Sequence, residues 1–234
     1  MKSPEVLPVD LGTGTVTSLV YERQGPPVGA SLILAHGAGA GQRSPFLVEF
    51  AHALASRGLD IVTFNFPYTE QGRRLPDRRP VLDACYSAVI AQVQRHVPSA
   101  GDWLFAGGKS MGGRIATHVV ASDAGSLVRG LVLLGYPLHP PGKPHERRDA
   151  HLPSLRRPAL IVQGSRDTFG TPDEFGDVIA RMTPPPTLHV VERGDHSFKV
   201  TPGGKAIQAG VHAAVQDAIV AWIQSVMSAR VSIT

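Results

Sequence analysis

The chain has 234 residues, 42% of them hydrophobic and 18% charged, so it can bury a sizeable core and is not expected to be disordered. Its net charge of +4 comes from scattered residues rather than one lysine-rich stripe, which argues against nucleic-acid binding. A single cysteine, Cys85, excludes an internal disulfide, and no unbroken apolar run marks a signal peptide or a membrane span, so we expect a cytoplasmic protein without a membrane partner.

Short apolar runs and longer amphipathic stretches alternate along the chain. The short runs predict strands over Val16–Tyr21, Ser31–Leu34, Ile61–Phe66, Trp103–Ala106, Gly130–Gly135, Ala159–Gln163 and Thr187–Val191. The longer stretches predict helices over Pro45–Ser56, Val81–Gln94, Met111–Val120, Pro172–Met182 and Ala206–Met227. Most strands are apolar on both faces, which is typical of a parallel sheet covered by helices on each side. The pattern therefore predicts one α/β domain over residues 1–234.

A glycine-flanked serine follows the strand at Trp103–Ala106. Gly108-Lys109-Ser110-Met111-Gly112 lies between this strand and the next helix, where a sharp turn exposes the serine hydroxyl. Small residues are needed two positions before and two after the serine because the turn is crowded and strained. We predict Ser110 as a nucleophile and the Met111 amide, at the helix start, as one oxyanion donor.

Two other interpretations of this segment are less well supported. A phosphate-binding P-loop would need glycine at position 103, which is Trp103, so that interpretation fails. A tight turn without chemistry stays possible on the motif alone, although the flanking strand and helix supply the context that a nucleophile requires.

A second glycine-rich loop, His36-Gly37-Ala38-Gly39-Ala40-Gly41, follows the strand at Ser31–Leu34. Residues with little or no side chain let the backbone approach a substrate oxygen, so we predict Ala38 as the second oxyanion donor, with Gly39 next in line. A dinucleotide-binding turn would need a glycine at Gln42 or Ser44, and neither frame completes it. A flexible loop is the remaining alternative.

The general base and its acid are expected after later strands. Asp167 follows the strand at Ala159–Gln163, and His196 follows the strand at Thr187–Val191, which gives the order Ser, Asp, His. Of ten histidines, His196 alone combines this order with a position after a strand. Asp195 is the rival acid, but adjacent residues in a turn usually point apart, which favours Asp167.

With these residues in place, the chain resembles the α/β-hydrolase superfamily along nearly its whole length. More narrowly it resembles small hydrolase-like proteins related to a subunit of the human NSL chromatin complex and to a testis-expressed relative. The segments that carry the resemblance are Leu34–Gly41, Phe64–Tyr68 with Gly72–Arg74, Gly107–Arg114, Gly164–Asp167 and Gly194–His196. It implies an α/β-hydrolase fold, and the segment Leu138–Pro158 is too short for more than a minimal cap. Lys109 stands where esterases often carry histidine.

These residues predict a serine hydrolase that cleaves an ester or thioester of a small acyl substrate, with no cofactor and no metal. Arg73 and Arg74, clustered with Arg78 and Arg79 in the segment Glu70–Pro80, could bind a substrate carboxylate or phosphate, although a solvated basic loop is the favoured explanation. Tyr68 is a further candidate for the substrate pocket. Two alternatives stay open: a hydrolase-like scaffold that binds proteins, and a peptidase or acyltransferase of the same fold. The sequence does not bear on the oligomeric state.

Overall fold

The computed structural model describes residues 2–122 and 126–231 and is built around one mixed sheet. Its strands are β1 (Glu5–Asp10), β2 (Thr15–Tyr21), β3 (Ser31–Ala35), β4 (Asp60–Phe64), β5 (Leu104–Lys109), β6 (Val128–Leu134), β7 (Ala159–Gly164) and β8 (Thr187–Val191). The strand order is β1-β2-β4-β3-β5-β6-β7-β8. β1 pairs antiparallel with β2 and β2 antiparallel with β4, whereas the six strands from β4 to β8 run parallel. The predicted, mostly parallel sheet is therefore confirmed.

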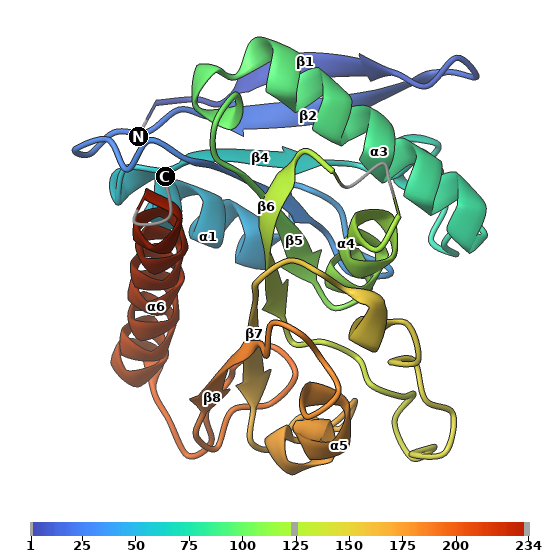
Figure 1. The fold of residues 1–234 in the computed structure, drawn as a ribbon, viewed down its shortest axis with the longest axis vertical. Helices are drawn as coiled ribbons and strands as arrows, with labels where there is room; N and C mark the ends of the chain where they lie inside the picture. Colours follow the sequence, from blue (N-terminus) through green and yellow to red (C-terminus); the bar gives the residue numbers. More distant parts are fainter. Residues whose placement is uncertain (1, 123–125, 232–234) are drawn as a thin grey trace.

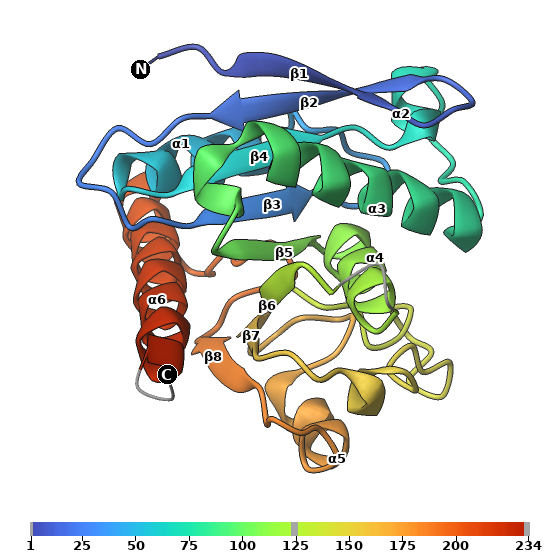
Figure 2. The same cartoon turned by 45° about the horizontal axis from the view of Figure 1, so that its top comes forward.

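Helices cover both faces of this sheet (Figures 1 and 2). The helices are α1 (Pro45–Ser56), α2 (Pro67–Glu70), α3 (Arg79–His96), α4 (Met111–Val120), α5 (Gly176–Ile179) and α6 (Lys205–Val231). α1 and α6 pack together on one face, around Phe50, Leu54 and Ile219. α3 and α4 pack together on the other face, around Tyr86 and Ile115. The buried side chains thus form two apolar layers, one on each side of the sheet.

The strand β1 was not predicted from the sequence. Its residues alternate between exposed and buried positions only from Leu7 onward, and Pro8 within it argues against a strand interior. β1 lies at the edge of the sheet and pairs only with β2, which is where proline is tolerated in a strand.

The predicted helix over Pro172–Met182 is wrong in extent. Residues Pro172–Phe175 form a 3-10 helix, and only Gly176–Ile179 are α-helical. Gly176 weakens the helical interior, and a run of three prolines begins at Pro184, so a longer helix has no room to continue. The segment nevertheless starts as expected, because the Thr171 amide donates to the Glu174 carboxylate at 2.9 Å.

The segment after β6 forms the minimal cap that the resemblance implies. Within residues 135–158 the only regular element is a short 3-10 helix, Leu152–Ser154. Leu138 and Leu152 anchor the segment because both are fully buried. No separate lid domain therefore covers the edge of the sheet at the carboxyl ends of β5, β7 and β8.

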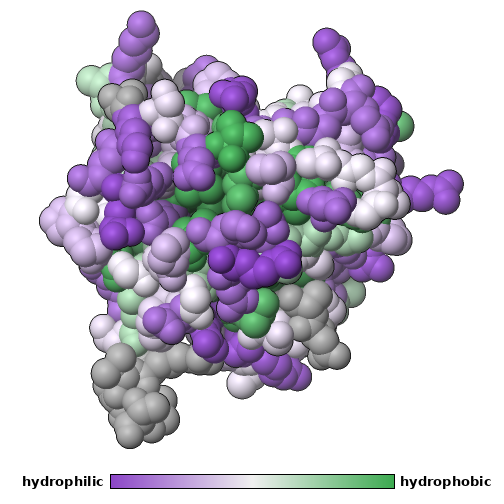
Figure 3. All heavy atoms as spheres, turned by 90° about the horizontal axis from the view of Figure 1, so that it is seen from above, coloured by the Kyte–Doolittle hydropathy of each residue, from purple (hydrophilic) through white to green (hydrophobic). Residues whose placement is uncertain are grey.

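The outer surface is mainly polar. Figure 3 shows hydrophilic residues over most of one face, with hydrophobic residues in groups that hydrophilic ones interrupt. One helical segment, Lys205–Ala229, has the length and composition that a membrane span needs, a test that core helices of soluble proteins also pass. In this structure Val215, Ile219 and Ile223 of that segment are buried in the core, and Gln216 with Asp217 interrupts its apolar residues.

Candidate active site

Ser110 lies at the sharp turn between β5 and α4. Its backbone has φ 52° and ψ −116°, a conformation that non-glycine residues rarely adopt and that costs roughly 1–3 kcal/mol. The Ser110 amide donates to the Leu134 carbonyl of β6 at 2.9 Å, which fixes the turn against the neighbouring strand. The side chain thus projects above the carboxyl edge of the sheet, where ligands of open α/β sheets bind.

The two glycines of the motif are required by the approach of β3. A Cβ atom at Gly108 would lie 2.4 Å from the Ala35 carbonyl oxygen, and one at Gly112 would lie at the same distance from it. Gly108 also has φ +154°, a region that L side chains rarely occupy. The spacing read from the sequence therefore has a steric cause: both positions face the end of β3.

His196 connects Ser110 with Asp167. Its Nε2 lies 2.9 Å from Ser110 Oγ, and its Nδ1 lies 2.8 Å from Asp167 Oδ2. Since a carboxylate can only accept, Nδ1 carries the proton and Nε2 accepts from the serine hydroxyl. The structure brings together three side chains from the loops after β5, β7 and β8, in the geometry that nucleophilic catalysis needs.

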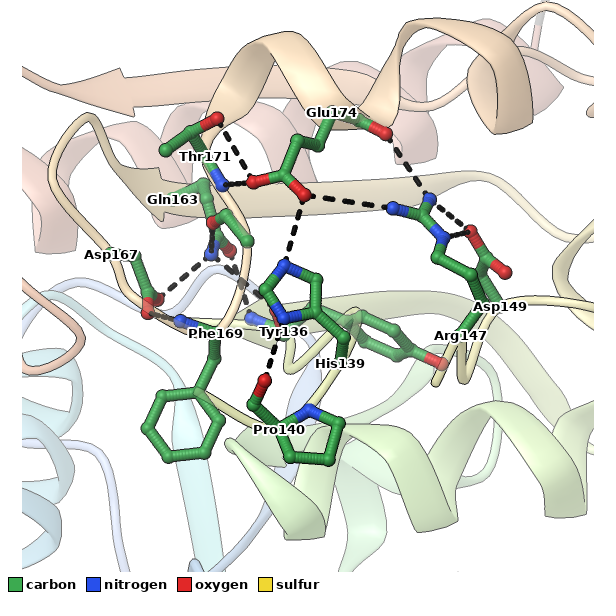
Figure 4. Close-up of polar contacts among 11 residues, drawn as sticks. Tyr136, His139, Pro140, Arg147, Asp149, Gln163, Asp167, Phe169, Thr171 and Glu174 are labelled. Atoms are coloured by element: carbon green, nitrogen blue, oxygen red, sulfur yellow. Dashed lines mark hydrogen bonds and ion pairs between the residues drawn. The ribbon is translucent and has the colours of Figure 1, made fainter. Parts of the chain in front are cut away.

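Asp167 is held in a closed network of hydrogen bonds (Figure 4). Its Oδ1 accepts from the Phe169 amide at 2.8 Å, and its Oδ2 also accepts from Gln163 Nε2 at 2.8 Å. Gln163 in turn accepts from the Tyr136 amide at 2.9 Å and donates to the Gly170 carbonyl at 2.7 Å. With the Asp167 carboxylate fully buried, these donors fix the acid and hence the ring it orients.

The rival acid, Asp195, has a different task. Its Oδ1 accepts from the amides of Ser197 and Lys199 at 2.8 and 2.9 Å, which closes the turn that carries His196. The His196 ring instead stacks on Phe169, with centroids 4.2 Å apart and planes at 29°. Asp195 therefore shapes the loop, while Asp167 contacts the imidazole.

The glycine-rich loop after β3 is anchored by His36. The His36 Nε2 accepts from the Phe66 amide at 3.2 Å, so Nδ1 carries the proton and donates to the Gly37 carbonyl at 2.9 Å. In a trans peptide the amide points opposite to the carbonyl, so the Ala38 N–H is directed away from His36. Burial lowers the pKa of His36, which keeps it neutral in this structural role.

The two candidates for the second oxyanion donor, Ala38 and Gly39, lie in different places. Ala38 and Met111 both line the cavity that contains Ser110 and His196. Gly39 has φ +71° and is not among the described residues that line this cavity. Met111 is the first residue of α4, where the amide has no partner within the helix and the helix dipole favours negative charge. The geometry thus favours Ala38 over Gly39 as the partner of Met111.

Comparison with known proteins places this arrangement in a family. A model of the α/β-hydrolase domain matches residues 28–224, which is most of the chain. The chain belongs to the α/β-hydrolase family. The match includes all three residues of the Ser110, His196 and Asp167 constellation and the whole parallel part of the sheet.

Solved structures of similar fold include three bacterial hydrolases. Dienelactone hydrolase from Anabaena variabilis is 20% identical, with a TM-score of 0.73 and coverage of 96% of this chain and 99% of that one. A lidless α/β serine hydrolase from Xanthomonas campestris is 19% identical, with a TM-score of 0.70 and coverage of 95% and 96%. An esterase domain from Rhodothermus marinus is 13% identical, with a TM-score of 0.70 and coverage of 96% and 99%. At these identities the likeness concerns the fold.

The cavity of this α/β hydrolase has a volume of about 510 Å³. Ser110, His196 and Phe169 line it, and its apolar lining also includes Phe46 and Leu82. Its size and mixed lining suit a small organic ligand. A larger cavity of about 930 Å³ lies elsewhere, near the turn between β1 and β2, and includes none of the residues Ser110, His196 and Asp167.

The candidate substrate-binding residues Tyr68, Arg73 and Arg74 are not among the described residues that line the Ser110 cavity. Arg73 lines the larger cavity instead, and its guanidinium donates to Asp77 Oδ1 at 2.6 Å. Arg74 is exposed and lines neither cavity. Tyr68 is 1% exposed and packs against His36, beneath the glycine-rich loop. The turn after α2 thus directs Arg73 toward Asp77 rather than toward Ser110.

The basic residues that line the site are Arg79, Lys109, Arg114 and Arg148. Of these, only Arg79 belongs to the arginine cluster considered in the sequence, and the other three were not predicted. Arg114 follows Ser110 by four residues, which on a helix places the two on one face, so this spacing was a usable signal. Arg148 had none, because only the folding of the cap segment brings it to the cavity. Within residues 2–122 and 126–231 no group of three or more His, Cys, Asp or Glu side chains could hold a metal ion.

Proposed function

We propose that this protein is a serine hydrolase that cleaves esters or thioesters through an acyl-enzyme. The observation that carries the proposal is the continuous chain of contacts from Ser110 Oγ to His196 at 2.9 Å and from His196 to Asp167 at 2.8 Å. Membership of the α/β-hydrolase family supports the same reaction class.

In the first half of the reaction, Ser110 Oγ attacks the substrate carbonyl carbon while His196 Nε2 takes the hydroxyl proton. The Met111 and Ala38 amides hold the oxyanion, and loss of one such donor costs roughly 3 kcal/mol of transition-state stabilisation. The bond to the leaving alcohol or thiol then breaks, and His196 gives it the proton. Asp167 stays ionised and stabilises the imidazolium.

In the second half, water replaces the leaving group. His196 takes a proton from water, the hydroxide attacks the acyl carbon, and the bond to Ser110 Oγ breaks as the proton returns to it. The products are a carboxylic acid and the free enzyme. The minimal cap leaves the cavity open to water, the acceptor that hydrolysis needs.

The test is hydrolysis of p-nitrophenyl acetate by the purified protein. Ser110→Ala is expected to lose activity by a factor of roughly 10⁴ or more. Ser197→Ala is the matched control, since this exposed serine lines the same cavity and no described side chain donates to its hydroxyl or accepts from it. Turnover that survives Ser110→Ala would refute the proposal.

The alternative of a protein-binding scaffold, suggested by the narrower resemblance to chromatin-complex proteins, makes the opposite prediction of no turnover. The strained backbone of Ser110 favours the enzyme, because a scaffold gains nothing from a serine held at φ 52°. A cytoplasmic location is part of the same proposal and is compatible with the single cysteine, which cannot form an internal disulfide. Fractionation of the native host would test it.

A further inference from the structure

The Ser110 cavity holds an excess of positive charge. Of the described residues that line it, Arg79, Lys109, Arg114 and Arg148 are basic, while Asp77 is the one carboxylate. Asp77 already accepts from Arg73 at 2.6 Å from outside the cavity. Arg79 pairs with Asp83, which does not line the cavity, at 3.9 Å. Among the described residues, Arg114 and Arg148 have no ion pair of this kind, although Asp83 also attracts Arg114 at longer range.

Arg114 is the least satisfied of these side chains. It lies one turn after Ser110 on α4, and its Nε is buried without a hydrogen-bond partner. Burial, and then the neighbouring Arg148, lower the pKa of Arg114. A guanidinium that is desolvated and repelled by a second guanidinium is destabilised, and a bound anion would relieve this.

Arg148 stands next to Arg114 with its backbone fixed and its side chain unengaged. Its amide donates to the Leu138 carbonyl at 2.7 Å, and its carbonyl accepts from the Tyr136 hydroxyl at 2.9 Å. Throughout the described parts of the chain, no acceptor lies within hydrogen-bond or ion-pair distance of its guanidinium. The cap segment thus presents a positioned cation that lacks a counter-ion.

Lys109 adds a third cation on the residue before the nucleophile. The side chain is nine-tenths buried, and its Nζ has no hydrogen-bond partner among the described residues. Its Nζ lies over the Phe46 ring, 6.0 Å from the centroid. Burial lowers the pKa of Lys109 to about 8, against a smaller opposing effect of Asp167 and Asp195. At neutral pH this side chain is still charged.

Two histidines behind the arginines show how positive this region is. His118 and His151 stack at 3.6 Å, and Arg79 donates to His118 Nδ1 at 3.1 Å. Burial, with smaller contributions from Arg79, Arg114 and, for His118, the stacked His151, lowers the pKa of His118 to about 3 and that of His151 to about 4. Both rings are neutral at neutral pH, because burial and the neighbouring guanidinium groups disfavour a further positive charge.

We propose that the substrate is an anionic acyl compound whose carboxylate or phosphate group is bound between Arg114 and Arg148 while its carbonyl reaches Ser110. Two guanidinium groups offer the planar, paired donors that carboxylate and phosphate oxygens accept, and the anion supplies the counter-charge that the free site lacks. Lys109 raises the positive potential beside the reacting carbonyl. This inference rests on the proposed hydrolase function.

The kinetic test compares p-nitrophenyl hexanoate with the p-nitrophenyl monoester of adipic acid, which replaces the terminal methyl group by a carboxylate. The wild-type protein is expected to prefer the adipate ester. Arg114→Gln with Arg148→Gln should reduce kcat/KM for the adipate ester by a factor of roughly ten or more, through KM, and change hexanoate by less than about twofold. Arg95→Gln, at the far end of α3, is the matched control and should change neither. Equal losses on both esters, or a wild-type preference for hexanoate, would overturn the inference and leave the hydrolase function intact.

A binding test does not depend on turnover. In Ser110→Ala protein, adipate and phenyl phosphate are each added, and the rise in Tm is compared with that in protein that also carries Arg114→Gln and Arg148→Gln. A rise that requires the arginines supports the site, and the stronger of the two ligands identifies the anion as carboxylate or phosphate. No rise with either ligand, or one that survives loss of both arginines, contradicts it. If neither ester is hydrolysed, the hydrolase function fails, while this binding result still decides the anion site.

Discussion

Two sets of charged residues at the Ser110 cavity differ in how completely their polar groups are satisfied. In the first set, here called the complete side, Asp167 receives three hydrogen bonds, from His196, Gln163 and the Phe169 amide. In the second set, here called the other side, the Arg114 Nε and the Lys109 Nζ are buried without a hydrogen-bond partner among the described residues. Both sets are charged, but only the first has its hydrogen-bond partners within the protein.

This difference separates chemistry from recognition. A catalytic group must be preorganised, so the protein supplies all of its partners before substrate arrives. A group that recognises substrate can lack a hydrogen-bond partner in the free protein, because the ligand supplies that partner. The binding free energy is then more favourable, since no existing hydrogen bond has to be broken. Removing a partner on the complete side should therefore reduce kcat, whereas removing a cation on the other side should affect binding and relieve strain.

The largest effect is expected at Asp167. Asp167→Asn removes the charge that orients and stabilises the His196 imidazolium, and we expect kcat for p-nitrophenyl acetate to fall by roughly 10³–10⁴-fold. Asp195→Asn is the matched control, because that carboxylate only accepts amides within its own turn. A small effect of Asp167→Asn with a large effect of Asp195→Asn would show that Asp195, and not Asp167, is the acid that supports His196.

An intermediate effect is expected at Gln163, which positions Asp167 without touching substrate. Gln163→Leu removes one donor to Asp167 and strands the Tyr136 amide, so we expect kcat to fall roughly 10- to 100-fold with KM unchanged. Gln216→Leu, at another buried glutamine on α6, controls for general loss of stability. If both variants lower Tm alike and neither lowers kcat, Gln163 has only a structural role.

The smallest effect on catalysis is expected at Lys109, where substitution should raise the free energy of unfolding rather than lower it. Because burial lowers its pKa from 10.5 to about 8, the folded state disfavours the charge at neutral pH, and stability rises as pH increases between these two values. Lys109→Met should stabilise the protein at pH 7 by about 3 kcal/mol at most, and the gain should vanish toward pH 10.5. Urea unfolding at both pH values measures this, with exposed Lys199→Met as control. Destabilisation at pH 7 would indicate that Lys109 has a partner.

The residues of the complete side were accessible to prediction because each follows a strand directly. Ser110, Asp167 and His196 come after β5, β7 and β8, and parallel strands bring their carboxyl ends to one edge. Gln163 also left a signal, as a lone polar residue in the otherwise apolar β7. It was not recognised because its partners, such as the Tyr136 amide, are long-range contacts.

The residues of the other side depend on tertiary structure. Arg148 lies in the cap segment, whose path is set by buried Leu138 and Leu152 rather than by any periodic pattern. Arg73 looked equivalent in sequence, yet the turn after α2 pairs it with Asp77. Local sequence thus predicts which loops reach the edge of the sheet, whereas the direction of a long side chain depends on neighbours far along the chain.

The most direct test of the central claim is covalent labelling. The native protein is treated with a fluorophosphonate, and the modified residue is identified by intact-mass and peptide mass spectrometry. The account predicts a single adduct on Ser110 that forms slowly in His196→Ala and is absent in Ser110→Ala. A folded protein that takes no label, or takes it on another serine while Ser110 stays free, would contradict the account.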